Sequence, residues 1–278
     1  MKKSLMLLSS AVVLFSTCEA NAFTYVYNGV TFNPYFSTKL GYARPVIALD
    51  GASLNIPDIS PEVDAIIKPI QSALDVVDLK FESRPVFSTM LAVGTKIQFN
   101  DVKPVTFRLE LEYQDSQDAK MEDKHISLPI SEEVNFGIGI SAKSSSYTMM
   151  LNGYIDVETK SFIKPYVSFG VGKTKIDASI SASLSNFSIS DFSLPFPVSV
   201  EAGSSADNII WSVGSGMSFE LTKAVSLDLQ YRYIDYGKIG FGDELSIFPL
   251  LGLPGPNGDL IKATVQSHQF ALGLRCYF

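Results

Sequence analysis

The chain of 278 residues lacks several features that define common classes of protein. It has only two cysteines, so neither a disulfide framework nor a cysteine-based zinc site is expected. Only 18% of its residues are charged and 12% are aromatic, which excludes global disorder. Its net charge of −7 argues against a nucleic-acid partner.

Long apolar runs are also missing beyond the N-terminus. A bundle of membrane-spanning helices is therefore excluded, because each helix needs about 18 or more consecutive apolar residues. The N-terminus itself has a different pattern: Lys2 precedes an apolar stretch, Leu5–Phe15, and small residues follow at Ala20 and Ala22. This pattern is typical of a secretory signal peptide. We expect residues 1–22 to be removed by cleavage after Ala22.

The rest of the chain repeats segments of about ten residues in which apolar and polar side chains alternate. In the segment 87–99, for example, Phe87, Leu91 and Val93 share one face, and small or polar residues occupy the other. Alternation with a period of two indicates β-strands with two unlike faces. Eight such strands are predicted: 34–44, 87–99, 105–114, 147–157, 163–176, 209–220, 225–233 and 267–278.

The connections between these strands alternate in length. Short turns are predicted at 100–104, 158–162 and 221–224, and long segments at 45–86, 115–146, 177–208 and 234–266. An even-numbered, up-and-down antiparallel sheet explains this alternation simply, and outer-membrane barrels combine short periplasmic turns with long outer loops. The sequence predicts an all-β fold for residues 23–278: an eight-stranded up-and-down antiparallel transmembrane β-barrel with four long extracellular loops and periplasmic termini.

A soluble barrel would also alternate, but with its apolar face inside. Two features favour the membrane form. Aromatic residues such as Tyr42, Phe99 and Trp211 lie near strand ends on the apolar face, as in interfacial girdles. The other face is rich in Gly, Ser and Ala with sparse charges, which suits the crowded lumen of a narrow barrel.

The charges expected in the lumen nearly balance, with six cations and five anions. Buried charges are tolerated when they are paired and hydrogen-bonded, and an eight-stranded barrel is just wide enough for side chains to fill. We therefore expect a closed lumen with a charge network rather than a wide pore. Its predicted members are Lys39, Lys96, Arg108, Glu110, Glu112, Asp156, Lys164, Glu220, Asp228, Arg232 and Arg275.

Three stretches resemble the opacity-type, OmpA-like family of outer-membrane barrels, which includes rickettsial-type surface antigens and adhesins. These stretches are Ile163–Gly172 (IKPYVSFGVG), Leu221–Tyr233 (LTKAVSLDLQYRY) and the closing Gly273–Phe278 (GLRCYF). The resemblance implies the fold and an outer-membrane location, but it brings no catalytic motif. The chain end also resembles the signal read by the outer-membrane assembly machinery, formed here by Phe270, Leu272, Leu274, Cys276 and Phe278.

The predicted long loops contain three further patterns. Ser60-Pro61 followed by apolar residues at helical spacing up to Val77 predicts a helix in the first loop, which either caps the barrel mouth or contacts a partner or lipid. Alternation over 180–190 predicts strands that continue into a hairpin. The apolar segment Leu245–Pro254 is expected to pack on the first-loop helix or to mark a partner site.

Three functions remain open. The first is a surface adhesin or antigen whose loops contact a host partner, and the second is a small channel for apolar solutes. The third is lipid modification by a histidine with a serine and an acid, and the candidates are His125 and His268 next to Ser267. Solvation explains His125 better, and interfacial hydrogen bonding explains His268 better. We therefore predict no catalytic residue, cofactor or metal, with outer-membrane lipid and the assembly machinery as partners.

Overall fold

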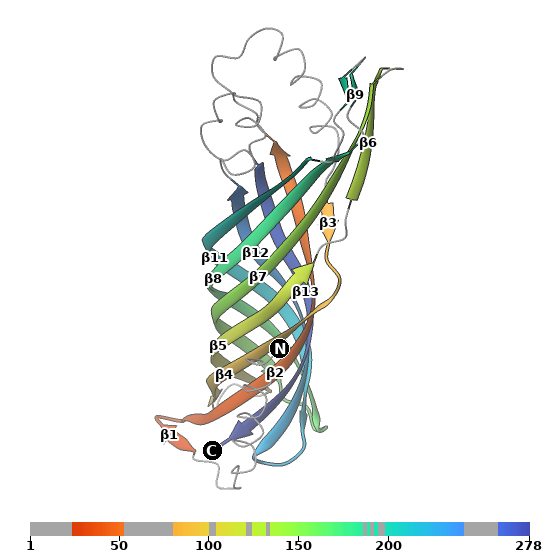
Figure 1. The fold of residues 1–278 in the computed structure, drawn as a ribbon. Helices are drawn as coiled ribbons and strands as arrows, with labels where there is room; N and C mark the ends of the chain where they lie inside the picture. The colour runs from red at the N-terminus through yellow and green to blue at the C-terminus, as the bar shows by residue number, and fades with distance from the viewer. Residues whose placement is uncertain are drawn as a thin grey trace.

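The computed structural model describes residues 24–52, 80–99, 104–120, 124–131, 134–185, 188–189, 192–193, 198–241 and 261–278. Its main feature is a set of eight long strands that form a tall barrel (Figure 1). These are β2 (Val30–Ala52), β4 (Val86–Phe99), β5 (Val105–Lys120), β7 (Val134–Val157), β8 (Ile163–Ser185), β11 (Val198–Glu220), β12 (Val225–Phe241) and β13 (Ile261–Tyr277).

Each long strand pairs antiparallel with the next one along the chain, and the barrel closes where β2 pairs with both β13 and β4. The predicted eight-stranded up-and-down barrel is therefore confirmed. Short strands add to this framework: β1 (Tyr25–Tyr27), β3 (Lys80–Glu82), β6 (Lys124–Ser131), β9 (Ser188–Ile189) and β10 (Phe192–Ser193). Among the described residues, no helix is long and apolar enough to cross a membrane.

The strands extend further than predicted, into segments that the sequence analysis assigned to loops. The ladder between β8 and β11 continues as far as the pair Leu184 and Val198, so both strands extend into the predicted third loop. Strands β5, β7, β12 and β13 also reach into the predicted loops. The predicted first-loop helix and the apolar segment 245–254 lie outside the described residues.

Strand β8 shows why the strands extend beyond their predicted ends. Its outward face carries Phe169 and Val171 but then changes to Lys173, and its inward face changes from Thr174 to Ile176. Alternation of exposed and buried residues continues through this point without a break. Side chains still alternate with a period of two, but the outward face becomes polar and the inward face apolar. A strand prediction that requires an apolar outward face therefore ends before the strand does.

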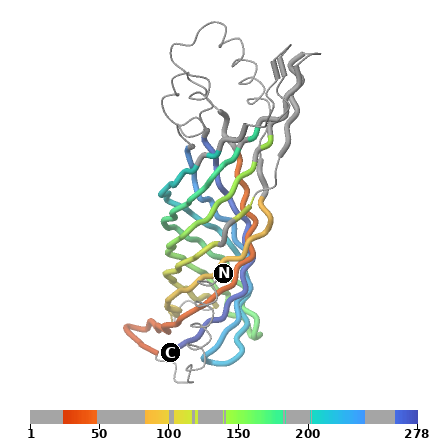
Figure 2. Tube along the Cα trace, viewed as in Figure 1, coloured from red at the N-terminus to blue at the C-terminus, as the bar shows by residue number. Residues whose placement is uncertain are grey.

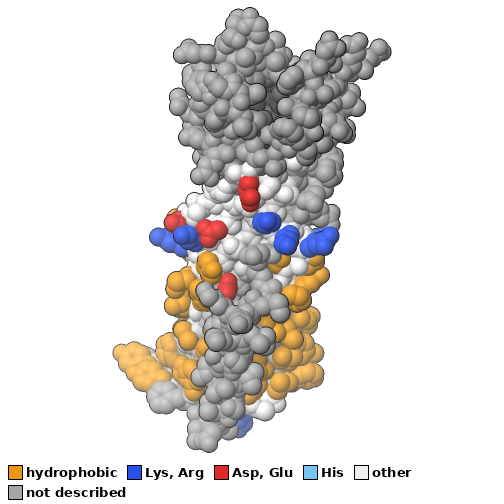
Figure 3. Space-filling view, in the orientation of Figure 1, with side chains coloured by type: hydrophobic (Ala, Val, Ile, Leu, Met, Phe, Trp, Pro, Cys, Tyr) orange, Lys and Arg blue, Asp and Glu red, His pale blue; other side chains and the backbone are white. Residues whose placement is uncertain are grey.

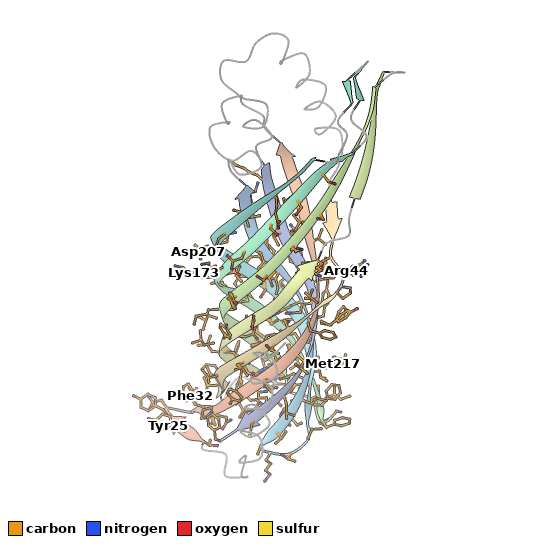
Figure 4. The ribbon with its side chains drawn as sticks, in the orientation of Figure 1. Tyr25, Phe32, Arg44, Lys173, Asp207 and Met217 are labelled. Atoms are coloured by element: carbon orange, nitrogen blue, oxygen red, sulfur yellow. The ribbon has the colours of Figure 1, made fainter. Side chains whose placement is uncertain are left out.

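This inversion divides the barrel into two halves. We call the part from the short turns to the outward Lys173 the turn-side half, and the part beyond it the loop-side half. On the face shown in Figure 3, hydrophobic side chains gather over the turn-side half as part of a belt, and a band of charged side chains lies above them. Lys173 and Asp207 lie together in this band, with Arg44 at a similar height (Figure 4).

Exposed large apolar side chains form the belt of the turn-side half. Val167, Phe169 and Leu229 are each about half exposed, as expected for side chains that face lipid. The predicted aromatic positions Tyr42 and Trp211 also face outward. Figure 2 shows the strands winding obliquely around the barrel axis, with the C-terminal Phe278 at the end that carries the turns.

The loop-side half has an apolar interior. Ile47, Ile176, Ile210 and Ile239 are almost completely buried there and belong to one hydrophobic cluster. A small cavity of about 30 Å³ remains between side chains that include Tyr236. This half is therefore built like a soluble barrel, with its core inside.

A seam lies between β11 and β12 in the described wall of the loop-side half. Their backbone ladder ends at the pair Trp211 and Asp235, although both strands continue. Gly237, with a positive φ of 78°, lies at a bulge in β12 and shifts its register. Beyond this point, Asn208 Nδ2 donates hydrogen bonds to the backbone carbonyls of Tyr236 (3.0 Å) and Lys238 (2.7 Å), so side chains hold the wall together.

Candidate functional site

The lumen of the turn-side half gathers the charged residues singled out in the sequence. Most of these side chains are buried, whereas Lys164 and Glu220, at the turn end, are partly exposed. Every second residue of a strand points inward, so eight neighbouring strands bring side chains distant in sequence into one narrow space. The charges form three layers along the barrel axis.

The layer nearest the loop-side half centres on two carboxylates. Lys39 Nζ contacts Glu110 and lies 2.7 Å from Glu112 Oε2. Arg232 Nη1 lies 2.7 Å from the other oxygen of Glu112, and its Nε donates to Gln269 Oε1 at 2.6 Å. Each carboxylate therefore has a cation or hydrogen-bond donor for both of its oxygens, as buried charges require.

The middle layer holds two arginine–aspartate pairs. Arg108 binds both oxygens of Asp156 through Nε and Nη2, at 2.7 and 2.8 Å. Arg275 Nη2 lies 2.8 Å from Asp228 Oδ1, and Arg108 Nη1 lies 3.9 Å from the other oxygen of Asp228. The guanidinium of Arg108 also lies 4.2 Å from the ring centroid of Tyr154. Paired and stacked guanidinium groups of this kind fix the geometry of the plug.

The layer at the turn end includes a carboxylate that the sequence analysis assigned to a turn. Glu158 accepts a hydrogen bond from Lys164 and lies 2.7 Å from Lys96 Nζ, while Glu220 lies 2.7 Å from Lys164 Nζ. Partial burial raises the pKa of the Glu158 carboxyl, but the hydrogen bonds from Lys164 and Lys96 outweigh it and hold this pKa below its ordinary value. With Glu158, the ion pairs of the described turn-side lumen involve six carboxylates and six cations.

Lumenal tyrosines were also missed. The hydroxyls of Tyr35 and Tyr154 donate to Glu110 Oε2 and Oε1, at 3.0 and 2.9 Å, and Tyr166 packs edge-on against Tyr154. Alternation contained the signal, since Tyr35 has the same parity as Lys39 on β2 and Tyr166 the same parity as Lys164 on β8. Charges and glycines identify that face in the sequence, whereas aromatic residues occur on both faces and do not.

Together the three layers and the tyrosines fill the turn-side lumen. Among the described residues, the ion pairs form a polar plug that includes Lys39 and Arg275. No cluster of three or more potential metal ligands occurs among the residues that the structure describes.

This architecture was compared with known protein families. The outer membrane protein beta-barrel domain family matches residues 11–278. The chain belongs to this family. It is an outer-membrane β-barrel protein of bacteria, as the opacity-type resemblance implied.

Outer membrane protein PagN of Salmonella typhimurium is 25% identical to this barrel protein over 159 residues. That match covers 56% of the chain and 60% of PagN, so the chain spans less than two thirds of this relative's length.

Solved structures also resemble the barrel protein. Neisserial surface protein A is 18% identical, with 88% of this chain and 97% of that chain covered and a TM-score of 0.38. Ail, the attachment invasion locus protein of Yersinia pestis, is 12% identical, with 88% and 98% covered and a TM-score of 0.33.

The C-terminal strand of the outer-membrane barrel protein places the predicted assembly signal at the turn end. Phe270, Leu272 and Phe278 are exposed on the outer surface, and Leu274 is partly exposed. Cys276 has the same parity along β13 as these residues but is only 5% exposed. The predicted cleavage residues, Ala20 and Ala22, lie outside the described residues.

The two histidines of the barrel protein occupy β6 and β13. His125 lies in β6, and its side chain is outside the described part of the chain. His268 faces outward, with Nδ1 2.8 Å from the hydroxyl of Tyr231, as the interfacial hydrogen-bonding interpretation expected. Ser267 points into the lumen and is almost fully buried, so it and His268 lie on opposite sides of the wall and cannot act on one substrate.

Proposed function

We propose that this outer-membrane protein is a surface adhesin or antigen that acts through the segments at its loop-side end. The observation that carries this proposal is the combination of a plugged lumen with a wall that continues far beyond the hydrophobic belt. Strand β8 has 13 residues from Lys173 to Ser185. At the usual strand rise and barrel tilt, these residues raise the part of the wall formed by β7, β8 and β11 roughly 30 Å above the belt. A hydrogen-bonded wall of this height suits presentation of loops away from the membrane.

Expression in a non-adherent bacterium tests the proposal. The wild-type protein is compared with a variant in which residues 53–79 and 242–260 are replaced by short glycine–serine linkers. We expect attachment to host cells to fall to the background of the empty strain, while the barrel still migrates as a folded, heat-modifiable band. Unchanged attachment by the folded variant would refute the proposal.

The proposal assumes an orientation with the loop-side half outside the cell and the termini in the periplasm. Protease added to intact cells should then cleave within 242–260 and leave the short turns intact. We also infer that the signal peptide ends at Ala22, so N-terminal sequencing of the mature protein should begin at Phe23. Deletion of Phe278 should lower assembly into the outer membrane if the chain end is the assembly signal.

A channel for apolar solutes is a second candidate, favoured by the apolar interior of the loop-side half. The charge layers beneath it argue against passage along the whole axis. Proteoliposomes that carry the protein provide the test, with uptake of a fluorescent apolar dye as the readout. Uptake well above that of protein-free liposomes would favour the channel over the adhesin, and uptake at the background rate would exclude it.

A further inference from the structure

The outer wall of the loop-side half contains an open trough of about 520 Å³ across β7, β8 and β11. This volume falls within the range of small-ligand sites. Its described lining residues form a grid of three rows, because the three strands are paired in register. The first row is Ser145, Asp177 and Ser205, the second is Ser144, Ala178 and Ser204, and the third is Lys143, Ser179 and Gly203.

The trough lies on the outside of the barrel. Lys143, Asp177 and Ser205, from the first and third rows, are exposed, whereas Ala178 of the middle row is buried. Ser204 also points inward, where its hydroxyl donates to the Gly240 carbonyl. The inward side chains two residues away, such as Ile176 and Ile180, are absent from the lining. A ligand would therefore approach from the outer medium and rest on the backbone of the middle row.

The chemistry of the lining selects among ligands. Three outward hydroxyls, of Ser145, Ser179 and Ser205, can each donate and accept hydrogen bonds, while Lys143 only donates and Asp177 only accepts. None of the described lining residues is aromatic, and alanine is the largest aliphatic residue among them. This composition disfavours an apolar ligand. The negative charge of Asp177 and the positive charge of Lys143 cancel, so the described lining carries no net charge. A neutral lining disfavours phosphates and metal cations.

We propose that this trough binds a neutral saccharide. Sugar hydroxyls both donate and accept, as the outward serines do. The grid spans about 10 Å across the strands and about 7 Å along them, which suits a small saccharide rather than a folded partner. The site stands on a rigid three-stranded sheet above the belt, so the sugar comes either from the headgroup of an outer-leaflet glycolipid or from a soluble or host glycan. The inference does not depend on the adhesive role of the loops.

Gly203 provides a test that leaves the fold intact. A Cβ atom added there would meet no other atom within 4 Å, so the backbone position accepts a side chain, and Gly203→Trp places a large one at the trough. Glu201→Trp is the matched control, because Glu201 is exposed on the same face of the same strand but does not line the trough. Asp177→Asn tests the acceptor with almost no change in shape. Heat-modifiable migration and circular dichroism verify that each variant is folded.

Binding is measured in two arms. In the first, protein in lauryldimethylamine oxide, a detergent without sugar, is mixed with N-acetylglucosamine, methyl glucoside or maltose, and saturation-transfer NMR detects bound sugar. In the second, phospholipid nanodiscs with and without lipopolysaccharide report glycolipid retained by the protein. A signal in the first arm indicates that a free glycan suffices, and a signal in the second arm alone indicates a membrane glycolipid.

We expect binding in at least one arm, weakened at least about tenfold by Gly203→Trp, reduced by Asp177→Asn and unchanged by Glu201→Trp. Absence of binding in both arms would overturn the inference. Binding that Gly203→Trp leaves intact would also overturn the inference, because the sugar would then bind outside this trough. Equal retention of phospholipid and lipopolysaccharide would overturn it as well, because the protein would then not recognise the saccharide.

Discussion

The two halves of the barrel share the same eight strands but distribute apolar and polar side chains in opposite ways between the outer face and the interior. In the turn-side half the outer face is apolar and the lumen holds Arg108, Asp156 and their neighbours as ion pairs. In the loop-side half the outer face is polar and the interior contains Ile176 and Ile210. The backbone pattern is common to both, so the solvent around each half decides which face is apolar. A membrane barrel can therefore continue as a barrel with an apolar interior without a break in its strands.

The largest expected effect comes from unpairing a charge in the turn-side lumen. Arg108→Met leaves the Asp156 carboxylate buried without its bidentate partner, and we expect a loss of about 3–5 kcal/mol in the free energy of unfolding. Denaturant unfolding in micelles, followed by the fluorescence of the single tryptophan, measures it. Arg108→Met combined with Asp156→Leu should recover most of the loss. If the double variant is as unstable as the single one, the pairing explanation fails.

A lysine placed on the outer face should distinguish the two halves directly. Val167→Lys puts a charge near the middle of the hydrophobic belt and should cost about 2–4 kcal/mol, because a charge facing lipid near the bilayer midplane is destabilising. Ser181→Lys lies on the same face of the same strand in the loop-side half, and we expect almost no change there. Unfolding in lipid vesicles provides the measurement. Equal costs for both variants would contradict the assignment of the belt.

The seam between β11 and β12 gives a smaller, local effect. Asn208→Ala removes two hydrogen bonds to β12, worth about 1–3 kcal/mol together, and backbone pairing does not replace them. Amide hydrogen exchange over 236–241 should therefore accelerate on the order of tenfold. Ser205→Ala, on the outer face of the same strand, serves as the control. Unchanged exchange in Asn208→Ala would show that the seam does not depend on this side chain.

The smallest effect concerns pH at the turn end. Because its hydrogen bonds to Lys164 and Lys96 lower the pKa of Glu158, this carboxylate stabilises the fold above its ordinary pKa of 4.5. The contribution is lost as pH falls below 4.5 through the lowered pKa. Unfolding free energies between pH 7 and pH 3 should show a shallower decline for Glu158→Gln than for wild type. Parallel profiles would mean that other carboxylates account for the acid sensitivity.

Much of the turn-side lumen could be predicted residue by residue. Inward parity alone places Lys39, Glu110 and Arg232 in one space, since the lumen of an eight-stranded barrel is narrow. Which cation meets which anion could not be predicted, because partners such as Arg232 and Glu112 lie on strands that pack only across the barrel. Glu158 was missed because it follows the last residue of its strand, where parity no longer applies.

The sequence by itself determined the number of long strands, their order and the inward or outward direction of the side chains within the predicted segments, because alternation and turn length are local properties of the chain. The tertiary structure alone decided where lipid contact ends, how the buried charges pair, and where the wall changes from backbone to side-chain bonds at Asn208. These features depend on register between neighbouring strands and on contacts across the barrel. Both relate residues far apart in sequence, which no local pattern records.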